Sequence, residues 1–590
     1  MNDEMPRRLP ARRGFSVSYR GKTLLSLIDP SGQADRAADT APVLNRTLYF
    51  CPSPLYGYGL ARLLERIGAG SAVLCVEADE RLMALTLETM PAEMREDRRL
   101  RLVRTSDAAA LCRFVRNCWG SRRFRRLETL RLSGGWQLAP ELYGNLAAAL
   151  RREMAVEWGN AMTLVKLGRR YIRNALRNLA LTGSGGGPAA GIEDLDYGGQ
   201  PVLVLGAGPS LDAALEGCAV RFAERLDPFR RPFKIICVDT ALTSLKARNI
   251  EPDLAVALES QHWNLRDFIG LGSRKIPVAM DLSALPATAG FSGGLFLFVT
   301  PWTELRLFDR LRAAGMLPEP LSPLGSVGLT AVELARRLTR GSVILAGIDF
   351  SFTLDASHAR SSPGHLALLA AQNRFRSLIS GAAFSSGAAA AAAKSGVLVR
   401  SNPAMRNYRS LFEQEFAADP RLRDIAGPGL PLGLKTLSME EALDALDTAP
   451  AGNVPAGSVH ADGLHADGEP GSVLAESEGS ARTGTAGSSG KKPERNSKLA
   501  AFMQKERAAL VLLRDILSGA AGPDTVSGEE LETMLDEADY LWAHFPECAG
   551  AGGRRPAAAD LSFLKRVRIE LDPFIRLWDL VLKEWFSAVE

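Results

Sequence analysis

The chain has 590 residues, and its 46% hydrophobic and 23% charged residues match the average globular protein, which excludes wholesale disorder. Lysine and arginine number 71 against 67 aspartates and glutamates, a balance of +4 that is too small to indicate a nucleic-acid binder. No apolar run approaches the ~18 residues that span a bilayer, and the N-terminal residues lack the apolar core of a secretory signal. The seven cysteines form no metal-type cluster. We therefore expect a cytoplasmic protein without a membrane span or a nucleic-acid partner, and the composition leaves its oligomeric state open.

The first folded unit is expected over residues 1–182. An apolar strand at Thr47–Cys51 is followed by the turn-rich Tyr56–Gly59, a stretch of helical period and a second strand that closes with Glu77. Strand, loop, helix and strand in this order predict a Rossmann-like α/β domain. Ligands bind such folds at the carboxyl ends of the strands. Two interpretations stay open: Glu77 holds a ribose, or this crevice is purely structural.

A second unit is expected over residues 200–447, where strand and helix patterns alternate as in a doubly wound parallel sheet. Its first strand, Val202–Leu205, runs into the loop Gly206–Ser210 and then a helix. Glycines allow a sharp turn and close approach of a ligand, and free amides at a helix start suit phosphate. Because Leu211 replaces the third glycine of the dinucleotide fingerprint, an ordinary NAD site is disfavoured and a nucleotide or nucleotide-sugar phosphate is favoured.

Carboxylates follow the next two strands of this unit. Asp239 and Thr240 come directly after the strand Phe233–Val238, and Glu259 follows the strand Leu254–Leu258. Carboxylates at neighbouring strand ends can hold ribose hydroxyls or a divalent cation. The alternative for Asp239 is that it only caps the next helix.

Two later segments add glycines and histidines. Gly325 and Ser326 open a helix, which provides another terminus suited to phosphate. The last apolar strand ends at Gly347 and Asp349, and the polar loop after it contains His358 and His365. Paired histidines indicate proton transfer, although either one alone could be a surface or locally bonded residue. We expect one sheet to gather these segment ends into a single site.

The remaining chain is predicted to contain a linker and a helical tail. Residues 448–497 are rich in Gly, Ser, Ala and Glu and lack aromatics, which indicates a disordered linker. A run of six alanines that ends at Lys394 is expected to be a low-complexity insert. Residues 498–590 show three amphipathic helices of a small bundle: one starts with a capping box at Ser527 and Glu530, and the last is expected to be divided at Pro573.

The central stretches resemble the MptE-like pyrophosphokinase domain and the motility accessory factors (Maf), a family of flagellin glycosyltransferases. The matching stretches are VLGAGPSLD (Val204–Asp212), VDTALTSLKARNIEPDLAVALE, GSVGLTAVELA and LAGIDFSF. The segments LLSLIDPSGQADRAA, TLVKLGRRYIRNALRNL and DIAGPGLPLG extend the similarity over residues 15–440. The resemblance implies a sialyltransferase-like central sheet and a CMP-activated donor.

By this resemblance, the protein transfers a nonulosonic-acid-type sugar from the CMP-activated donor to Ser or Thr of flagellin, with inversion. His358 and Asp349 would be the catalytic residues, with His358 as the base. The residues implied in donor binding are Gly206, Gly208, Pro209, Ser210, Asp239, Thr240, Glu259, Gly325, Ser326 and Gly347. No cofactor is firmly implied; if Mg²⁺ takes part, Asp239, Glu259 and Asp349 would hold it.

Two alternatives stay open. The first is ATP-dependent pyrophosphoryl transfer to a hydroxymethylpterin, with Mg²⁺ held by the three carboxylates. The second is a non-catalytic flagellin-binding or assembly factor with a degenerate nucleotide site. Two departures from the family's pattern motivate the second alternative: Glu259 stands where the family usually has Asp, and Ile348 interrupts its usual Gly-Gln-Asp.

Overall fold

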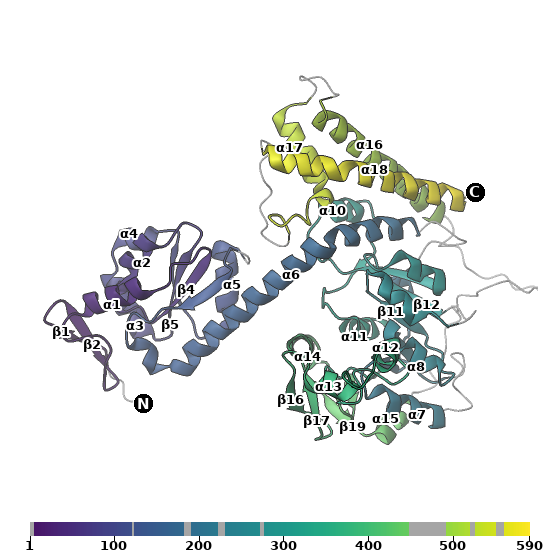
Figure 1. The fold of residues 1–590 in the computed structure, drawn as a ribbon, viewed down its shortest axis with the longest axis horizontal. Coiled ribbons are helices and arrows are strands. Elements are labelled where there is room, and N and C mark those ends of the chain that lie inside the picture. The colour runs from purple at the N-terminus through teal and green to yellow at the C-terminus, as the bar shows by residue number, and fades with distance from the viewer. Residues whose placement is uncertain are drawn as a thin grey trace, which may run out of the picture. The chain divides into compact units, whose positions relative to one another are not determined.

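The structure is a computed structural model, shown in Figure 1, that describes residues 5–120, 123–181, 190–221, 231–271, 276–447, 491–519, 526–549 and 560–589. The chain divides into two compact units. The N-terminal unit comprises Met1–Arg169, Thr303–Leu305 and Asp539–Phe563, and the central unit comprises Arg170–Trp302, Arg306–Ala538 and Leu564–Glu590. Helices surround a parallel sheet in each unit, which confirms the predicted α/β fold class. Among the described residues, no helix is long and apolar enough to cross a membrane.

The N-terminal unit contains a parallel sheet of four strands in the order β6-β5-β4-β7. The strands are β4 (Thr47–Pro52), β5 (Ala72–Glu77), β6 (Leu100–Arg104) and β7 (Arg126–Thr129). The chain builds outward from β4 to β6 and then returns to the other side of β4. The strand order therefore reverses between β4 and β7, and the loops that leave these two strands diverge there.

Alternation along β4 explains why helices cover both faces of this sheet. Tyr49 and Cys51 pack in one apolar core, while Leu48 and Phe50 pack in the core on the opposite face. The helices of the first core are α1 (Pro30–Thr40) and α2 (Leu60–Arg66), and those of the second are α5 (Ala108–Trp119) and the start of α6 (Pro140–Ala180). A small antiparallel sheet precedes them, formed by β1 (Arg7–Pro10), β2 (Phe15–Tyr19) and β3 (Lys22–Thr23).

The central unit contains a ten-stranded sheet in the order β14-β13-β12-β11-β10-β9-β15-β18-β19, with β8 beside β13, and its pairings are parallel. Its strands are β8 (Ala190–Gly191), β9 (Val202–Leu205), β10 (Lys234–Val238), β11 (Leu254–Ala257), β12 (Ile276–Asp281), β13 (Ser292–Val299), β14 (Glu319–Pro320), β15 (Val343–Ala346), β18 (Leu422–Ile425) and β19 (Lys435–Leu437). The chain builds outward from β9 to β14 and then returns to β15, on the other side of β9. The strand order therefore reverses between β9 and β15, where ligands bind in open α/β sheets.

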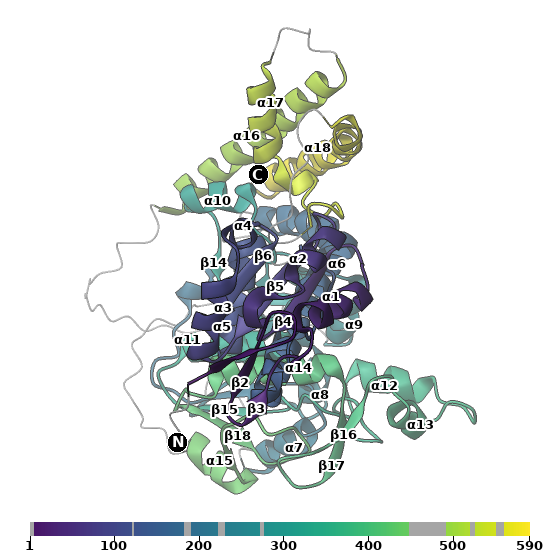
Figure 2. The same ribbon diagram turned by 90° about the vertical axis from the view of Figure 1, so that its left-hand side faces the viewer.

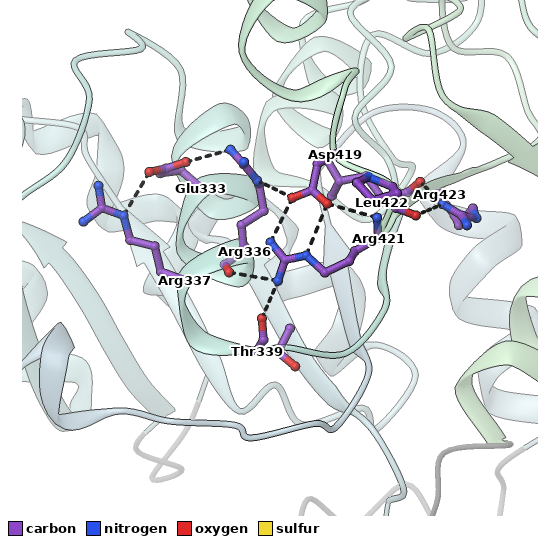
Figure 3. A network of polar contacts seen from close by, with 9 residues as sticks. Glu333, Arg336, Arg337, Thr339, Asp419, Arg421, Leu422 and Arg423 are labelled. Carbon is purple, nitrogen blue, oxygen red and sulfur yellow. Dashed lines mark hydrogen bonds and ion pairs between the residues drawn. The ribbon is translucent and has the colours of Figure 1, made fainter.

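The amino ends of the central strands are fixed by a network of ions, shown in Figure 3. Asp419 accepts hydrogen bonds from Arg421 Nη2 and Arg336 Nε, both at 2.8 Å. Arg421 also donates to the carbonyl of Thr339 at 2.7 Å, at the end of α11 (Val327–Leu338). These hydrogen bonds hold the pKa of Asp419 well below its usual range. The network ties α11 to the segment before β18 at the edge of the sheet opposite the candidate site.

The low-complexity alanine run forms a strand: β16 (Ala389–Ala392) pairs antiparallel with β17 (Leu398–Ser401), because backbone hydrogen bonds need no particular side chain. Residues 448–490 of the predicted linker lie outside the described residues, whereas residues 491–497 begin helix α16 (Lys491–Leu517).

The tail contains α16, α17 (Gly528–Glu537) and α18 (Leu561–Val589). The predicted capping box forms: Ser527 N donates to Glu530 Oε2 at 2.8 Å, and Glu530 N donates to Ser527 Oγ at 3.2 Å. The expected division at Pro573 is wrong, because α18 continues through it. Proline removes one helical hydrogen bond, but the fully buried Leu571 and Trp578 anchor the helix on both sides of it.

Candidate functional site

The loops that leave β9 and β15 are joined by their backbones. Gly206 N donates to Ala346 O and Gly208 N donates to Gly347 O, each at 2.8 Å. A Cβ atom on Gly206 would lie 2.3 Å from Gly347 O, and one on Gly208 would lie 2.4 Å from an Asp349 carboxylate oxygen. The glycines are therefore required for this close approach. Their amides bond within the protein, whereas the sequence pattern predicts that they hold phosphate.

Asp349 and Ser210 lock the same two loops together. Ser210 N donates to Asp349 Oδ2 at 2.7 Å, Ser210 Oγ donates to Oδ1 at 2.6 Å, and Gly347 N donates to Ser210 Oγ at 3.0 Å. Asp349 is 2% exposed, and burial raises its pKa. The structure thus places both side chains between the loops, rather than free to contact a substrate. Pro209 stands in the same loop, before α7 (Leu211–Arg221).

A buried cation stands behind Asp349. Lys394 Nζ donates to both carboxylate oxygens of Asp424 at 2.7 Å, and its charge opposes the effect of burial on the pKa of Asp349. The side chains of this ion pair are 3% and 2% exposed. Burial raises the pKa of Asp424 to about 6, and Lys394 opposes that rise. The hairpin that carries Lys394 is thereby fixed to β18, the strand beside β15.

Asp239 lies at the end of β10, 3% exposed. Its Oδ1 accepts from Thr240 N at 2.7 Å, and its Oδ2 accepts from Asn264 Nδ2 at 2.6 Å. Burial raises the pKa of Asp239, and the negative charge of Glu259 raises it further. Glu259 itself is exposed after β11 and accepts from Gln261 N at 2.7 Å. The structure therefore brings these two carboxylates into electrostatic contact.

A third carboxylate joins this pair and was missed by the sequence reasoning. Asp267, in α9 (Leu265–Phe268), is 5% exposed, and its buried Oδ1 has no hydrogen-bond partner among the described residues. Burial raises the pKa of Asp267 to about 7, and the charges of Asp239 and Glu259 add to that rise. Near neutral pH this group can therefore take up or release a proton.

Two asparagines of α6 hold the ends of β11 and β12. Asn174 Nδ2 donates to the carbonyls of Ser260 and Ser283, both at 3.0 Å. Asn178 Nδ2 donates to Leu282 O at 2.9 Å and to Ala284 O. Both asparagines are buried. Two asparagines four residues apart on an apolar helix face are the sequence signal that could have identified this contact.

The amino end of α11 is the site's best remaining terminus for an anion. Ser326 precedes the helix and makes no side-chain capping bond, and Gly325 is exposed with a φ of +71°. A Cβ atom on Gly328 would lie 3.1 Å from Ile348, which follows Gly347 in the loop after β15. The first turn of α11 therefore lies beside the reversal of strand order. Its backbone N–H groups and the positive end of its dipole suit a phosphate.

His358 is positioned across the carboxyl ends of β9 and β10. Ala359 N donates to Ala207 O at 2.9 Å, and Thr243 Oγ1 donates to Ser361 O at 2.8 Å, so the loop that carries His358 is bonded to both neighbouring segments. The hydroxyl of Ser357 lies 3.2 Å from His358 Nδ1. Burial, together with the positive charges of Arg266 and His365, lowers the pKa of His358. The imidazole is therefore neutral near pH 7 and able to accept a proton.

The predicted metal ligands are not brought together. Asp349 is bonded to Ser210, whereas Asp239 is bonded to Asn264 and is electrostatically paired with Glu259. In the part of the chain that the structure describes, no three Asp, Glu, His or Cys side chains are placed to hold a metal ion. The trio of carboxylates does not fit a shared Mg²⁺ site.

Comparisons with known proteins support the family resemblance. Residues 174–355 match the family model described as 6-hydroxymethylpterin diphosphokinase MptE-like. The structure of MAf glycosyltransferase from Magnetospirillum magneticum AMB-1 is similar, with a TM-score of 0.51 and 15% identity, over 100% of this chain and 94% of that chain. A protein of Treponema pallidum (strain Nichols), described only as uncharacterized, is 29% identical over 582 residues, which cover 97% of this chain and 95% of its own length. The predicted resemblance to Maf and MptE-like proteins is thus confirmed.

Proposed function

We propose that this protein, whose residues 174–355 form an MptE-like domain within a Maf-like fold, is a glycosyltransferase. Its donor is a CMP-activated sugar of the nonulosonic-acid type. Its acceptor is a Ser or Thr hydroxyl of flagellin, modified in the cytoplasm. The similar solved structure is that of a Maf glycosyltransferase, and this supports the proposed class of reaction.

The observation that carries this proposal is the position of His358. Its loop is bonded to Ala207 after β9 and to Thr243 after β10, so a neutral imidazole lies over the carboxyl ends of β9 and β10, next to the reversal between β9 and β15. The first turn of α11 approaches the same place through Gly328 and Ile348. A base and an anion-binding helix terminus are the two groups that displacement of a nucleotide by a hydroxyl requires.

The proposed reaction is a single displacement with inversion. The acceptor oxygen forms a bond to the anomeric carbon while the bond from that carbon to the CMP phosphate oxygen breaks. The hydroxyl proton moves to His358, and CMP leaves with the electron pair of the broken bond. The amides of α11 stabilise the charge that develops on the departing phosphate. Asp349 acts as a positioning residue, because its carboxylate is occupied by Ser210.

The test is transfer by the purified full chain. Incubation with CMP-activated nonulosonic acids and flagellin is expected to give a sugar-sized increase in the mass of flagellin. His358→Ala is expected to reduce the rate by about 10²- to 10⁴-fold, the usual contribution of a positioned base. His460→Ala, in the predicted linker outside the described residues, is the matched control. No mass increase with any such donor would contradict the proposal.

The runner-up is pyrophosphoryl transfer from ATP to a hydroxymethylpterin, which the description of the matching family model favours. It needs Mg²⁺, and the dispersed carboxylates argue against a shared metal site among the described residues. Calorimetry separates the two functions. Binding of CMP without metal supports the glycosyltransferase, and binding of ATP only with Mg²⁺ supports the pyrophosphokinase.

A further inference from the structure

An apolar arm extends from the central unit directly after the His358 loop. The arm comprises residues 363–384, with α12 (Pro363–Ala370) and α13 (Leu378–Ala383), and Figure 2 shows both helices standing out from the rest of this unit. Its large hydrophobic side chains are exposed: Phe384 88%, Phe375 82%, Ile379 56%, Leu366 51%, Leu368 45% and Leu369 41%. Soluble proteins rarely leave so contiguous an apolar surface uncovered unless another molecule covers it.

The charge on the arm itself has one sign. Residues 363–384 contain no Asp or Glu and two arginines. Arg374 and Arg376 are both exposed, and Arg374 lies over the ring of Phe375 at 4.4 Å. Neither arginine forms an ion pair within the described ranges. Such a surface is complementary to a partner with apolar and acidic side chains.

The arm begins next to His358, the candidate base. Ser362 caps α12 by accepting a hydrogen bond from His365 N at 3.3 Å, and His365 is 5% exposed. A Cβ atom on Gly364 would lie 3.7 Å from His358 Nδ1. The first turn of the arm therefore lies beside the imidazole that receives the acceptor's proton in the proposed reaction.

We infer that the arm docks the acceptor polypeptide, through apolar side chains flanked by carboxylates. The inference rests on the proposed function. A second copy of this chain fits less well, because a two-fold contact between arms would bring together two surfaces that carry only positive charge. A lipid surface also fits less well, because interfacial helices present one apolar and one basic face, whereas the leucines of α12 point to more than one side of an eight-residue helix.

The experiment measures binding of fluorescently labelled flagellin to the purified full chain, with CMP binding measured in parallel. The test variant is Phe375→Ser with Phe384→Ser, and the matched control is Val220→Ser, which removes an 83% exposed side chain from α7. We expect the double variant to weaken flagellin binding by about tenfold or more, since exposed aromatics are typical hot spots. CMP affinity should not change in either variant. In the wild type, flagellin binding should also weaken as the salt concentration rises, because salt screens the attraction between the arginines of the arm and the partner's carboxylates.

Each outcome decides the inference. Flagellin binding that is absent in the wild type, or that is equal in the wild type and the double variant, would overturn it. Loss of a dimer in the double variant during light scattering, or loss of its flotation with phosphatidylglycerol vesicles while flagellin binding persists, would assign the arm to a second copy or to a lipid surface. If the wild-type chain does not bind CMP, the proposed function is contradicted. A weaker binding of flagellin by the double variant would still support the arm as a docking site.

Discussion

The two parallel sheets of this protein reverse their strand order in the same way, but different groups cover the two reversals. In the N-terminal unit the reversal lies between β4 and β7, and in the central unit it lies between β9 and β15. Topology predicts a ligand at both positions. The segment that covers each position determines whether a ligand can bind there.

In the N-terminal unit, the preceding hairpin fills the reversal with hydrocarbon. Leu24, Val17 and Tyr19 pack in one apolar cluster with Leu55 and Tyr56 of the loop after β4. Leu24 O also accepts from Gly134 N, at 2.6 Å, in the loop after β7. The same segment therefore seals the loops after both strands.

The acid at the end of β5, next to that reversal, already has hydrogen-bond partners. Glu77 is fully buried, and its carboxylate accepts from Ser53 Oγ at 2.7 Å, from Tyr143 OH at 2.9 Å and from two backbone amides. Burial raises the pKa of Glu77, and these hydrogen bonds oppose the rise. The structure thus favours the structural interpretation of Glu77 over ribose binding.

The central reversal is built from charges instead. Lys394, Asp424, Asp349 and Ser210 form a buried polar chain under the loops, and the neutral His358 lies across them. Hydrocarbon closes one site, whereas buried ions shape the other and leave a proton acceptor above it. The two reversals share a topology that favours a ligand site, but the segment that covers each one determines whether a reaction can occur there.

The largest effect is expected from removal of the buried cation, Lys394. Lys394→Met is expected to lower the free energy of unfolding by about 3–5 kcal/mol, because it leaves a buried carboxylate without its partner. The loss should grow from pH 5 to pH 8: without Lys394 the pKa of Asp424 rises further, and stability is lost as pH rises through a raised pKa. Denaturant unfolding measures both effects. Arg340→Met, which breaks an exposed pair with Asp196, should change stability by less than about 1 kcal/mol.

The apolar cluster that covers the N-terminal reversal can also be tested through the free energy of unfolding. Leu24→Ala removes a side chain that is 2% exposed, and it should cost about 2–5 kcal/mol of unfolding free energy. CMP affinity should stay unchanged, because the seal belongs to the N-terminal unit. The control is Leu27→Ala, at a position that is 52% exposed, with an expected change near zero. A loss of CMP binding in Leu24→Ala would show that the sealed reversal takes part in donor binding.

A smaller effect is expected at the opposite edge of the central sheet. Asp419→Asn should lower the unfolding free energy at pH 7 by about 1.5–3 kcal/mol, the contribution of hydrogen bonds to a charged group, and should leave CMP binding intact. Because the pKa of Asp419 is lowered in the fold, its stabilisation is present above its ordinary value of 3.8 and is lost as pH falls below that value. The difference between the wild type and the variant should therefore begin to shrink below about pH 4 and should continue to shrink as pH falls further. A constant difference over that range would contradict the assigned role of the carboxylate.

The smallest expected effect is a shift in the pH dependence of kcat/KM, which tests whether His358 is the base. The acid limb of kcat/KM should lie below the ordinary imidazole pKa of about 6.5, since burial and Arg266 lower the pKa of His358. Arg266→Met removes a neighbouring positive charge and should move the limb upward, by less than about one unit. A limb that stays in place would show that another group, such as Asp267, controls the rate.

Local sequence determined the elements that carry the site. Buried strands followed by glycines or acids identified β9, β10, β11 and β15, because a two-faced apolar run and a sharp turn need particular residues in sequence. The capping box of α17 was predicted for the same reason: its two partners are three residues apart.

Contacts between distant parts of the folded chain determine which of these residues are free to act. Ser210 and Asp349 are 139 residues apart, yet they bond to each other and so become positioning residues. Lys394, at the end of an alanine run, becomes the buried partner of Asp424, and Leu24 seals a reversal that the topology alone would leave open. Sequence patterns record local backbone and burial preferences, whereas the occupancy of a polar group depends on partners that only the folded chain brings within hydrogen-bond distance.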